Sequence, residues 1–141
     1  MKNRALTCRV MDEDAKASSP PILDRSVAYS LRVVKLYREL EKDSVGRVLG
    51  KQLLRSGTSI GANLHEGQAA QSRPDFIAKL HIAFKEARES AYWLRLIGEA
   101  DLIAASRLKP LRDETAELIK ILSSILVATK RGLKSKSALL A

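Results

Sequence analysis

Several residue types and patterns are scarce or missing in this chain, and each absence narrows what the protein is. Cys8 is the only cysteine among 141 residues, which excludes an intrachain disulfide and a cysteine-based metal cluster. No apolar run approaches the ~20 residues that cross a bilayer, and the first residues lack the continuous apolar stretch of a secretory signal. We therefore expect a cytoplasmic protein without a membrane partner.

Signals for β-structure and for common catalytic sites are also missing. The chain has no alternating apolar stretch and no Asn-Gly hairpin turn. It contains neither a nucleophile elbow nor a glycine-rich phosphate-binding loop. We therefore predict an all-α protein that is not an enzyme, with no catalytic residues and no cofactor.

Positive charge, by contrast, is abundant. The chain has 25 Lys+Arg against 16 Asp+Glu, a formal net charge of +9. Such a surface attracts polyanions, so nucleic acid or an acidic partner fits it. Simple solubility explains the same charge and stays open as the alternative.

A row of four glycines marks the segment from residue 45 to residue 67. Gly46, Gly50, Gly57 and Gly61 are spaced 4, 7 and 4 residues apart, so at about 100° per residue they share one stripe of a helix. Each glycine inside a helix costs about 1 kcal/mol relative to alanine. We interpret the stripe as the place where another helix backbone approaches closely.

Four helices are predicted, with start signals at Asp24, Ser44, Ser72 and Ser106. Gly67 is predicted to end the second helix. Short connections make sequential helices antiparallel, which predicts an up-down-up-down four-helix bundle over residues 22–130. We expect residues 1–21 to be a disordered polar leader and residues 131–141 a flexible basic tail.

The first predicted helix has two apolar faces. One face holds Val27, Leu31 and Val34, and the other holds Tyr29, Val33, Leu36 and Leu40. Two such faces are more than one bundle core needs. We therefore expect the chain to form a homo-oligomer.

A polar stripe beside the glycines invites comparison with a metal site. A ferritin-like site needs Glu-x-x-His on two helices, whereas Glu89 stands where the histidine after Glu86 would be. We therefore predict no metal and expect Arg55 to pair with one of these glutamates. The residues that we assign to helix packing or interfaces are Gly46, Gly50, Gly57, Gly61, Ser56, Ser59, Asn63 and Trp93.

Basic residues cluster on the first two predicted helices and near the C-terminus. Phosphate contacts through such residues would be salt-sensitive and tolerant of sequence. A solvated helix surface is the alternative interpretation. The candidate nucleic-acid-binding residues are Arg25, Arg32, Lys35, Arg47, Lys51, Lys130, Arg131 and Lys134.

Two stretches, RSGTSIGANLHEG and QSRPDFIAKLHIAFKEARESAYWLRLI, give the chain a family resemblance. It resembles the bacterial four helix bundle protein family, which includes proteins encoded by intervening sequences within 23S rRNA genes. The resemblance spans about residues 24 to 130 and implies a homo-pentameric ring of up-down bundles with a basic surface. A more distant likeness is to a pentameric bundle that serves diversity-generating retroelements by binding nucleic acid and a reverse transcriptase.

Together these observations predict a non-enzymatic, oligomeric helical-bundle protein whose basic surface binds RNA or DNA non-specifically. In a ring, many weak phosphate contacts would act together. The alternative is a protein–protein adaptor or assembly module that binds an unidentified protein partner and whose positive charge is incidental.

Overall fold

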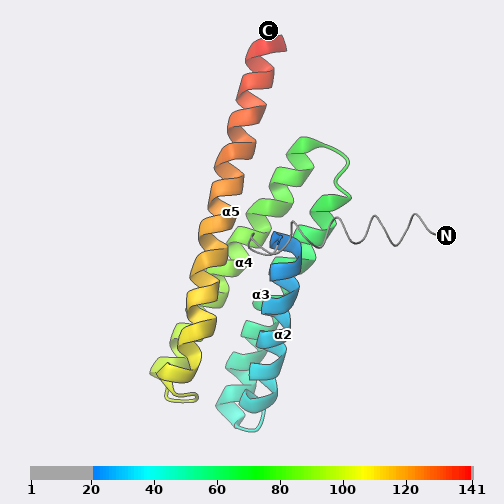
Figure 1. The fold of residues 1–141 in the computed structure, drawn as a ribbon. Coiled ribbons are helices and arrows are strands. Elements are labelled where there is room, and N and C mark those ends of the chain that lie inside the picture. The colour runs from blue at the N-terminus through cyan, green and yellow to red at the C-terminus, as the bar shows by residue number, and fades with distance from the viewer. Residues whose placement is uncertain (1–20, 141) are drawn as a thin grey trace, which may run out of the picture.

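The computed structural model describes the backbone of residues 21–140 and the side chains of residues 21–132. Over these residues the fold is all-α, with four helices and no strand (Figure 1). The helices are α2 (Ile22–Leu40), α3 (Ser44–Gln68), α4 (Arg73–Glu99) and α5 (Ala105–Leu140). None of these helices is long and apolar enough to cross a membrane.

Short connections join the four helices. In Figure 1 the α2–α3 and α4–α5 connections lie at the lower end of the view, and the α3–α4 connection lies toward the upper end. Residues 1–20 of the predicted leader, which was placed at residues 1–21, lie outside the described residues. The predicted boundary at residue 130 does not coincide with a helix end, because α5 continues to Leu140.

Three of the four predicted helix starts need correction, and one of these is that of α5, which begins at Ala105, one residue before Ser106. Helix α2 begins at Ile22, directly after Pro21. Asp24 lies in its first turn, where its negative charge interacts favourably with the positive end of the helix dipole. Asp43, not Ser44, caps α3: it has extended backbone angles, and its carboxylate accepts a hydrogen bond from the Gly46 N–H at 2.8 Å. The Ser72 cap is confirmed, because its hydroxyl accepts from the Asp75 N–H at 3.2 Å.

Helix α3 ends next to Gly67, as predicted, but Gly67 is not the residue that follows the helix. The helix runs on to Gln68, and Gly67 is buried inside its last turn. A Cβ at this position would stand 3.4 Å from the Phe76 ring, in ordinary contact distance. Gly67 therefore lies against α4 with room for a Cβ, and its backbone does not adopt the positive φ of a helix-ending glycine.

The glycine stripe of α3 lies against α2. A Cβ at Gly57 would stand 3.0 and 3.1 Å from the two Val33 methyl groups, and one at Gly61 would stand 3.0 Å from the Ser26 hydroxyl oxygen. At Gly46 the added atom would press on the backbone carbonyl of Leu40. The helix that approaches the stripe is thus α2 of the same chain.

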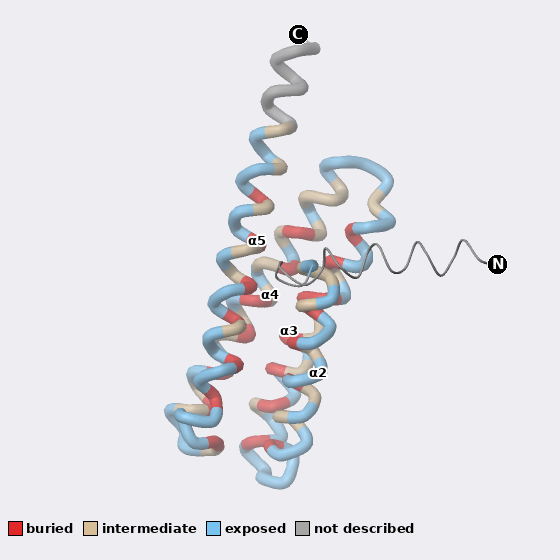
Figure 2. The backbone as a smooth tube through the Cα atoms, in the orientation of Figure 1, coloured by how far each residue is buried: buried red, intermediate tan, exposed pale blue. Residues whose placement is uncertain are grey.

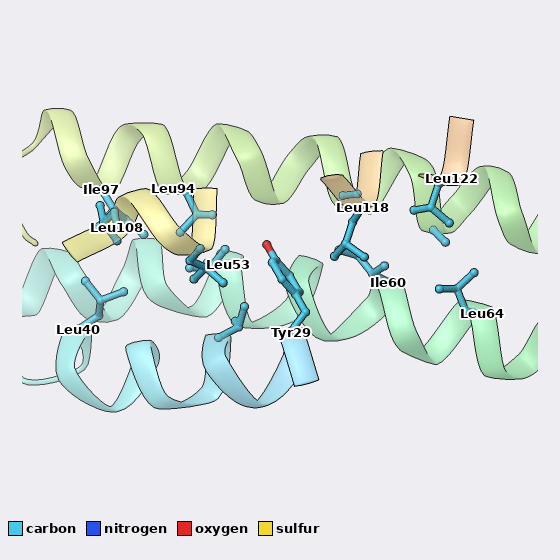
Figure 3. Packing of buried hydrophobic residues seen from close by; sticks show 14 of the residues in the cluster. Tyr29, Leu40, Leu53, Ile60, Leu64, Leu94, Ile97, Leu108, Leu118 and Leu122 are labelled. Carbon is cyan, nitrogen blue, oxygen red and sulfur yellow. The ribbon is translucent and has the colours of Figure 1, made fainter. Parts of the chain in front are cut away.

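The core lies along the inner sides of all four helices (Figures 2 and 3). Tyr29 reaches into its centre, where its hydroxyl and the Thr115 hydroxyl share a hydrogen bond of 2.8 Å. The surrounding fully buried side chains include Val33, Leu53, Ile60, Leu94, Ile97, Leu118 and Leu122. Burial raises the pKa of the Tyr29 phenol.

Helices α2 and α5 make the least extensive of the four helix–helix contacts. Three polar links join them. Arg25 pairs with Glu114 at 2.6 Å, Tyr29 bonds to Thr115, and Arg107 pairs with Glu39 at 2.8 Å. The candidate site lies between these two helices.

Candidate nucleic-acid interface

A groove of about 500 Å³ runs between the C-terminal half of α2 and the first turns of α5. It lies where the contact between these two helices is less extensive than the other helix–helix contacts of the fold. The residues that line it are Arg32, Lys35, Leu36, Arg38, Glu39, Lys42, Arg107, Leu108 and Leu111.

The lining is strongly basic. Five of its residues are Lys or Arg and one is acidic, which gives the groove a formal charge of +4. Glu39 is engaged by Arg107, whose Nη2 contacts both carboxylate oxygens at 2.8 and 2.9 Å. The other four cations, Arg32, Lys35, Arg38 and Lys42, form no ion pair with another described residue. Their charge is therefore available to an anionic ligand.

The floor of the groove is apolar. Leu108 is 1% exposed and Leu111 is 6% exposed, so both belong to the bundle core, and Leu36 packs beside them. The groove thus combines a cationic rim with a hydrophobic base. Such a surface suits a ligand that has both negative charge and an apolar face.

Arg25 belongs to the α2–α5 contact and not to the groove lining. Its Nε and Nη2 atoms donate to the two carboxylate oxygens of Glu114 at 2.6 and 3.0 Å, and its side chain is only 20% exposed. The hydrogen bond to Glu114 raises the pKa of Arg25. Of these three candidate residues of α2, Arg25 is thus engaged by Glu114, whereas Arg32 and Lys35 line the groove.

The remaining predicted basic residues do not line the groove either. Arg47 and Lys51 are exposed on α3, and Arg47 donates to the Glu41 carbonyl at 3.2 Å. Lys130 and Arg131 are exposed on α5, about 30 Å from the groove along the helix at ~1.5 Å per residue. The side chain of Lys134 lies outside the described residues.

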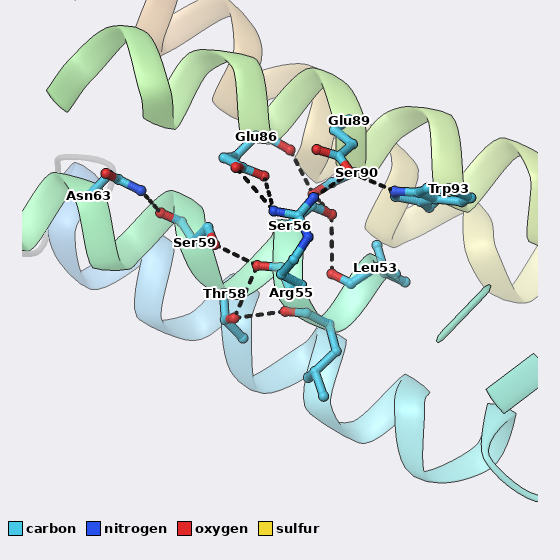
Figure 4. Close-up of polar contacts among 11 residues, drawn as sticks. Leu53, Arg55, Ser56, Thr58, Ser59, Asn63, Glu86, Glu89, Ser90 and Trp93 are labelled. Carbon is cyan, nitrogen blue, oxygen red and sulfur yellow. Dashed lines mark hydrogen bonds and ion pairs between the residues drawn. The ribbon is translucent and has the colours of Figure 1, made fainter. Parts of the chain in front are cut away.

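A separate polar cluster joins α3 to α4 (Figure 4). Arg55 donates to both Glu86 oxygens at 3.2 Å and also pairs with Glu89, which accepts from the Trp93 indole N–H at 3.1 Å. The Arg55 guanidinium, followed by the Trp93 N–H, holds the pKa of Glu89 below its ordinary value. Both carboxylates that invited a metal site are thus engaged by one arginine.

The small polar residues of this stripe play two different roles. Ser56 is buried and accepts a hydrogen bond from Ser90 of α4 at 2.9 Å, so it links two helices. Ser59 and Asn63 instead donate to the Arg55 and Ser59 carbonyls of their own helix, at 2.7 and 2.8 Å. Only Ser56 among the three forms a hydrogen bond across helices within the described part of the chain.

Comparison with known proteins places the chain in a family. The family model described as "23S rRNA-intervening sequence protein" matches residues 21–124. The chain belongs to this family. The chain is also similar to a protein of unknown function from the S23 ribosomal protein family of Bacteroides thetaiotaomicron, whose crystal structure is known. The two are 43% identical, with a TM-score of 0.72, over 75% of this chain and 98% of the other. No curated protein matches.

The matched region of this 23S rRNA-intervening sequence protein contains the whole groove, whereas Lys130, Arg131 and Lys134 lie beyond it. Sequence reasoning found Arg32 and Lys35 but missed Arg38, Lys42 and Arg107. Arg38 lies three residues after Lys35, and Lys42 lies four residues after Arg38, so the helical spacing of the cations could have indicated both. Arg107 carries no such signal, because only the packing of α5 brings it to α2.

Proposed function

We propose that this 23S rRNA-intervening sequence protein is a non-enzymatic, oligomeric protein that binds RNA or DNA through the α2–α5 groove. The observation that carries this proposal is a set of four groove-lining cations, on α2 and just after it, that form no ion pair with another described residue. Lys and Arg recognise phosphate without reading base sequence, so the expected binding is salt-sensitive and non-specific.

A charge-matched comparison tests the groove. We expect Arg32→Glu with Lys35→Glu to weaken binding of labelled RNA or duplex DNA in fluorescence anisotropy. The control is Arg47→Glu with Lys51→Glu, which makes the same charge change on exposed α3 positions outside the groove. The slope of log affinity against log salt should become shallower by about 0.7–0.9 per lost phosphate contact in the groove variant.

Each other result has a defined meaning. Equal losses in both double variants would assign binding to net charge and not to the groove. No binding of any nucleic acid at ~50 mM salt, where phosphate contacts are strong, would refute the nucleic-acid function. The adaptor alternative would then be favoured, because Val45, Val48 and Tyr92 expose apolar surface that a partner protein can cover.

We also propose that the subunit is an antiparallel up-down-up-down bundle that assembles into a ring, with five subunits as the family resemblance implies. The support for assembly is the outward apolar face of α2, where Leu31 is 64% exposed and Val27 is 44% exposed. The glycine stripe lends no support, since α2 already covers it. A ring would present several grooves to one polymer and so raise its apparent affinity.

Light scattering tests the assembly. We expect a mass near five times the 15.6 kDa of one chain. Leu31→Glu should lower that mass, whereas Val127→Glu, a similar change at a 49%-exposed position on α5, should leave it unchanged. A mass near 15.6 kDa for the unaltered protein at micromolar concentration would refute oligomerisation.

A further inference from the structure

We propose that the α2–α5 groove selects single-stranded over duplex nucleic acid and holds about three nucleotides along α2. This inference rests on the proposed nucleic-acid function and adds the class of ligand. It follows from the groove's size, its apolar floor and the planar guanidinium of Arg107 beside Glu39.

The cations follow the axis of α2. Arg32, Lys35 and Arg38 succeed one another every three residues, so they span about 9 Å of helix at ~1.5 Å per residue, and Lys42 follows just beyond the helix end. At the ~3.4 Å rise of one stacked strand, 9 Å corresponds to about three nucleotides. The row therefore matches the phosphates of a short stretch of a single strand.

The groove excludes a duplex from its interior. A volume of about 500 Å³ is that of a small-molecule pocket. A double helix, whose major groove alone is ~12 Å wide, is too large to enter such a pocket. A duplex can therefore touch only the rim cations. An unpaired strand can place a base against Leu36, the partly exposed leucine of the floor, which a duplex cannot do because its bases are stacked inside.

Arg107 supplies a flat surface where the lining has no aromatic ring. Its guanidinium is held by both carboxylate oxygens of Glu39, and its side chain is 59% exposed. An arginine plane can stack on an unpaired base much as an aromatic ring does. Since Glu39 already neutralises this arginine, stacking and not phosphate pairing is the contact that it offers.

Fluorescence anisotropy with a labelled 12-nucleotide oligo-dT strand and with its dT·dA duplex tests the inference at one fixed salt concentration. We expect the single strand to bind about tenfold more tightly than the duplex. Arg107→Lys keeps the charge but removes the plane, and we expect it to weaken single-strand binding about five- to tenfold with duplex binding unchanged. Arg112→Lys, at an exposed α5 position outside the groove, is the matched control and should change neither.

The outcomes separate this inference from the proposed function. Equal or tighter binding of the duplex, still weakened by Arg32→Glu with Lys35→Glu, would overturn the single-strand inference and leave the function intact. A loss of single-strand and duplex binding in equal measure on Arg107→Lys would also overturn it, because the plane would then have no role in reading unpaired bases. Failure to bind either probe at low salt would overturn both.

Discussion

Two alanine substitutions in one helix test how tightly α2 is seated on α3. Gly57 and Gly67 are both buried in α3, but a Cβ at Gly57 would stand 3.0 Å from a Val33 methyl group, whereas one at Gly67 would have 3.4 Å to its nearest neighbour. Both changes remove a glycine from a helix, which by itself favours the folded state by up to about 1 kcal/mol. The difference in stability between the two variants therefore reports mainly the packing around each site.

Val33 cannot make room for a methyl group at Gly57. It is 0% exposed, both of its methyl carbons lie within 3.1 Å of the added atom, and a β-branched side chain in a helix has one preferred rotamer. The helices must therefore separate, and such overpacking typically costs about 1–3 kcal/mol. We expect Gly57→Ala to be less stable than Gly67→Ala by this amount, although Gly57 lies deeper in the helix and gains more from the change.

Thermal unfolding at a fixed chain concentration measures this difference, since the stability of an oligomer depends on concentration. One kcal/mol corresponds to a shift in Tm of about 2–8 °C for domains near this size. Val33→Ala combined with Gly57→Ala should recover part of the loss, because the two positions are in contact. Equal Tm values for the two glycine variants would refute the claim that α2 is seated too closely for a Cβ.

Two further predictions follow from single side chains. Because Arg55 and Trp93 lower the pKa of Glu89, the folded state gains stability above the ordinary Glu value of ~4.3 and loses it as the pH falls through the lowered pKa. The Tm difference between the unaltered protein and Glu89→Gln should thus be present at pH 7 and shrink below about pH 4; a difference independent of pH would contradict this. At the start of α3, Asp43→Ala should cost about 1 kcal/mol while Ser44→Ala costs little, and the reverse order in urea unfolding would return the cap to Ser44.

The sequence was informative where one helix determines the answer. Four glycines on one stripe predict a close helix neighbour whatever that neighbour is, and Ser72 with Pro74 marks a helix start through local hydrogen bonding. Asp43 and Ser44 are both good caps, so composition alone could not choose between them. The backbone decides, because Asp43 is the residue that adopts extended angles.

Contacts between distant segments were beyond sequence reasoning. Arg25, Arg32 and Lys35 are all predicted to bind nucleic acid. Arg25, however, pairs with Glu114, which lies 89 residues later in the chain. Arg107 lines the groove and pairs there with Glu39, which lies 68 residues earlier in the chain. The spacing of residues along the sequence predicts neither ion pair, because each pair depends on how α5 lies beside α2.

The glycine stripe and the basic groove are two consequences of where α2 lies. Without Cβ atoms on the facing side of α3, α2 approaches α3 until the Val33 methyl groups occupy the space that a side chain at Gly57 would need. On its other side, α2 makes a much less extensive contact with α5, where three polar links join the two helices. One of these links, between Arg107 and Glu39, lies in the lining of the groove, which stays open beside it. The spacing of the glycines therefore predicts the close contact from the sequence. No local residue pattern predicts the groove, because it depends on how α5 lies beside α2.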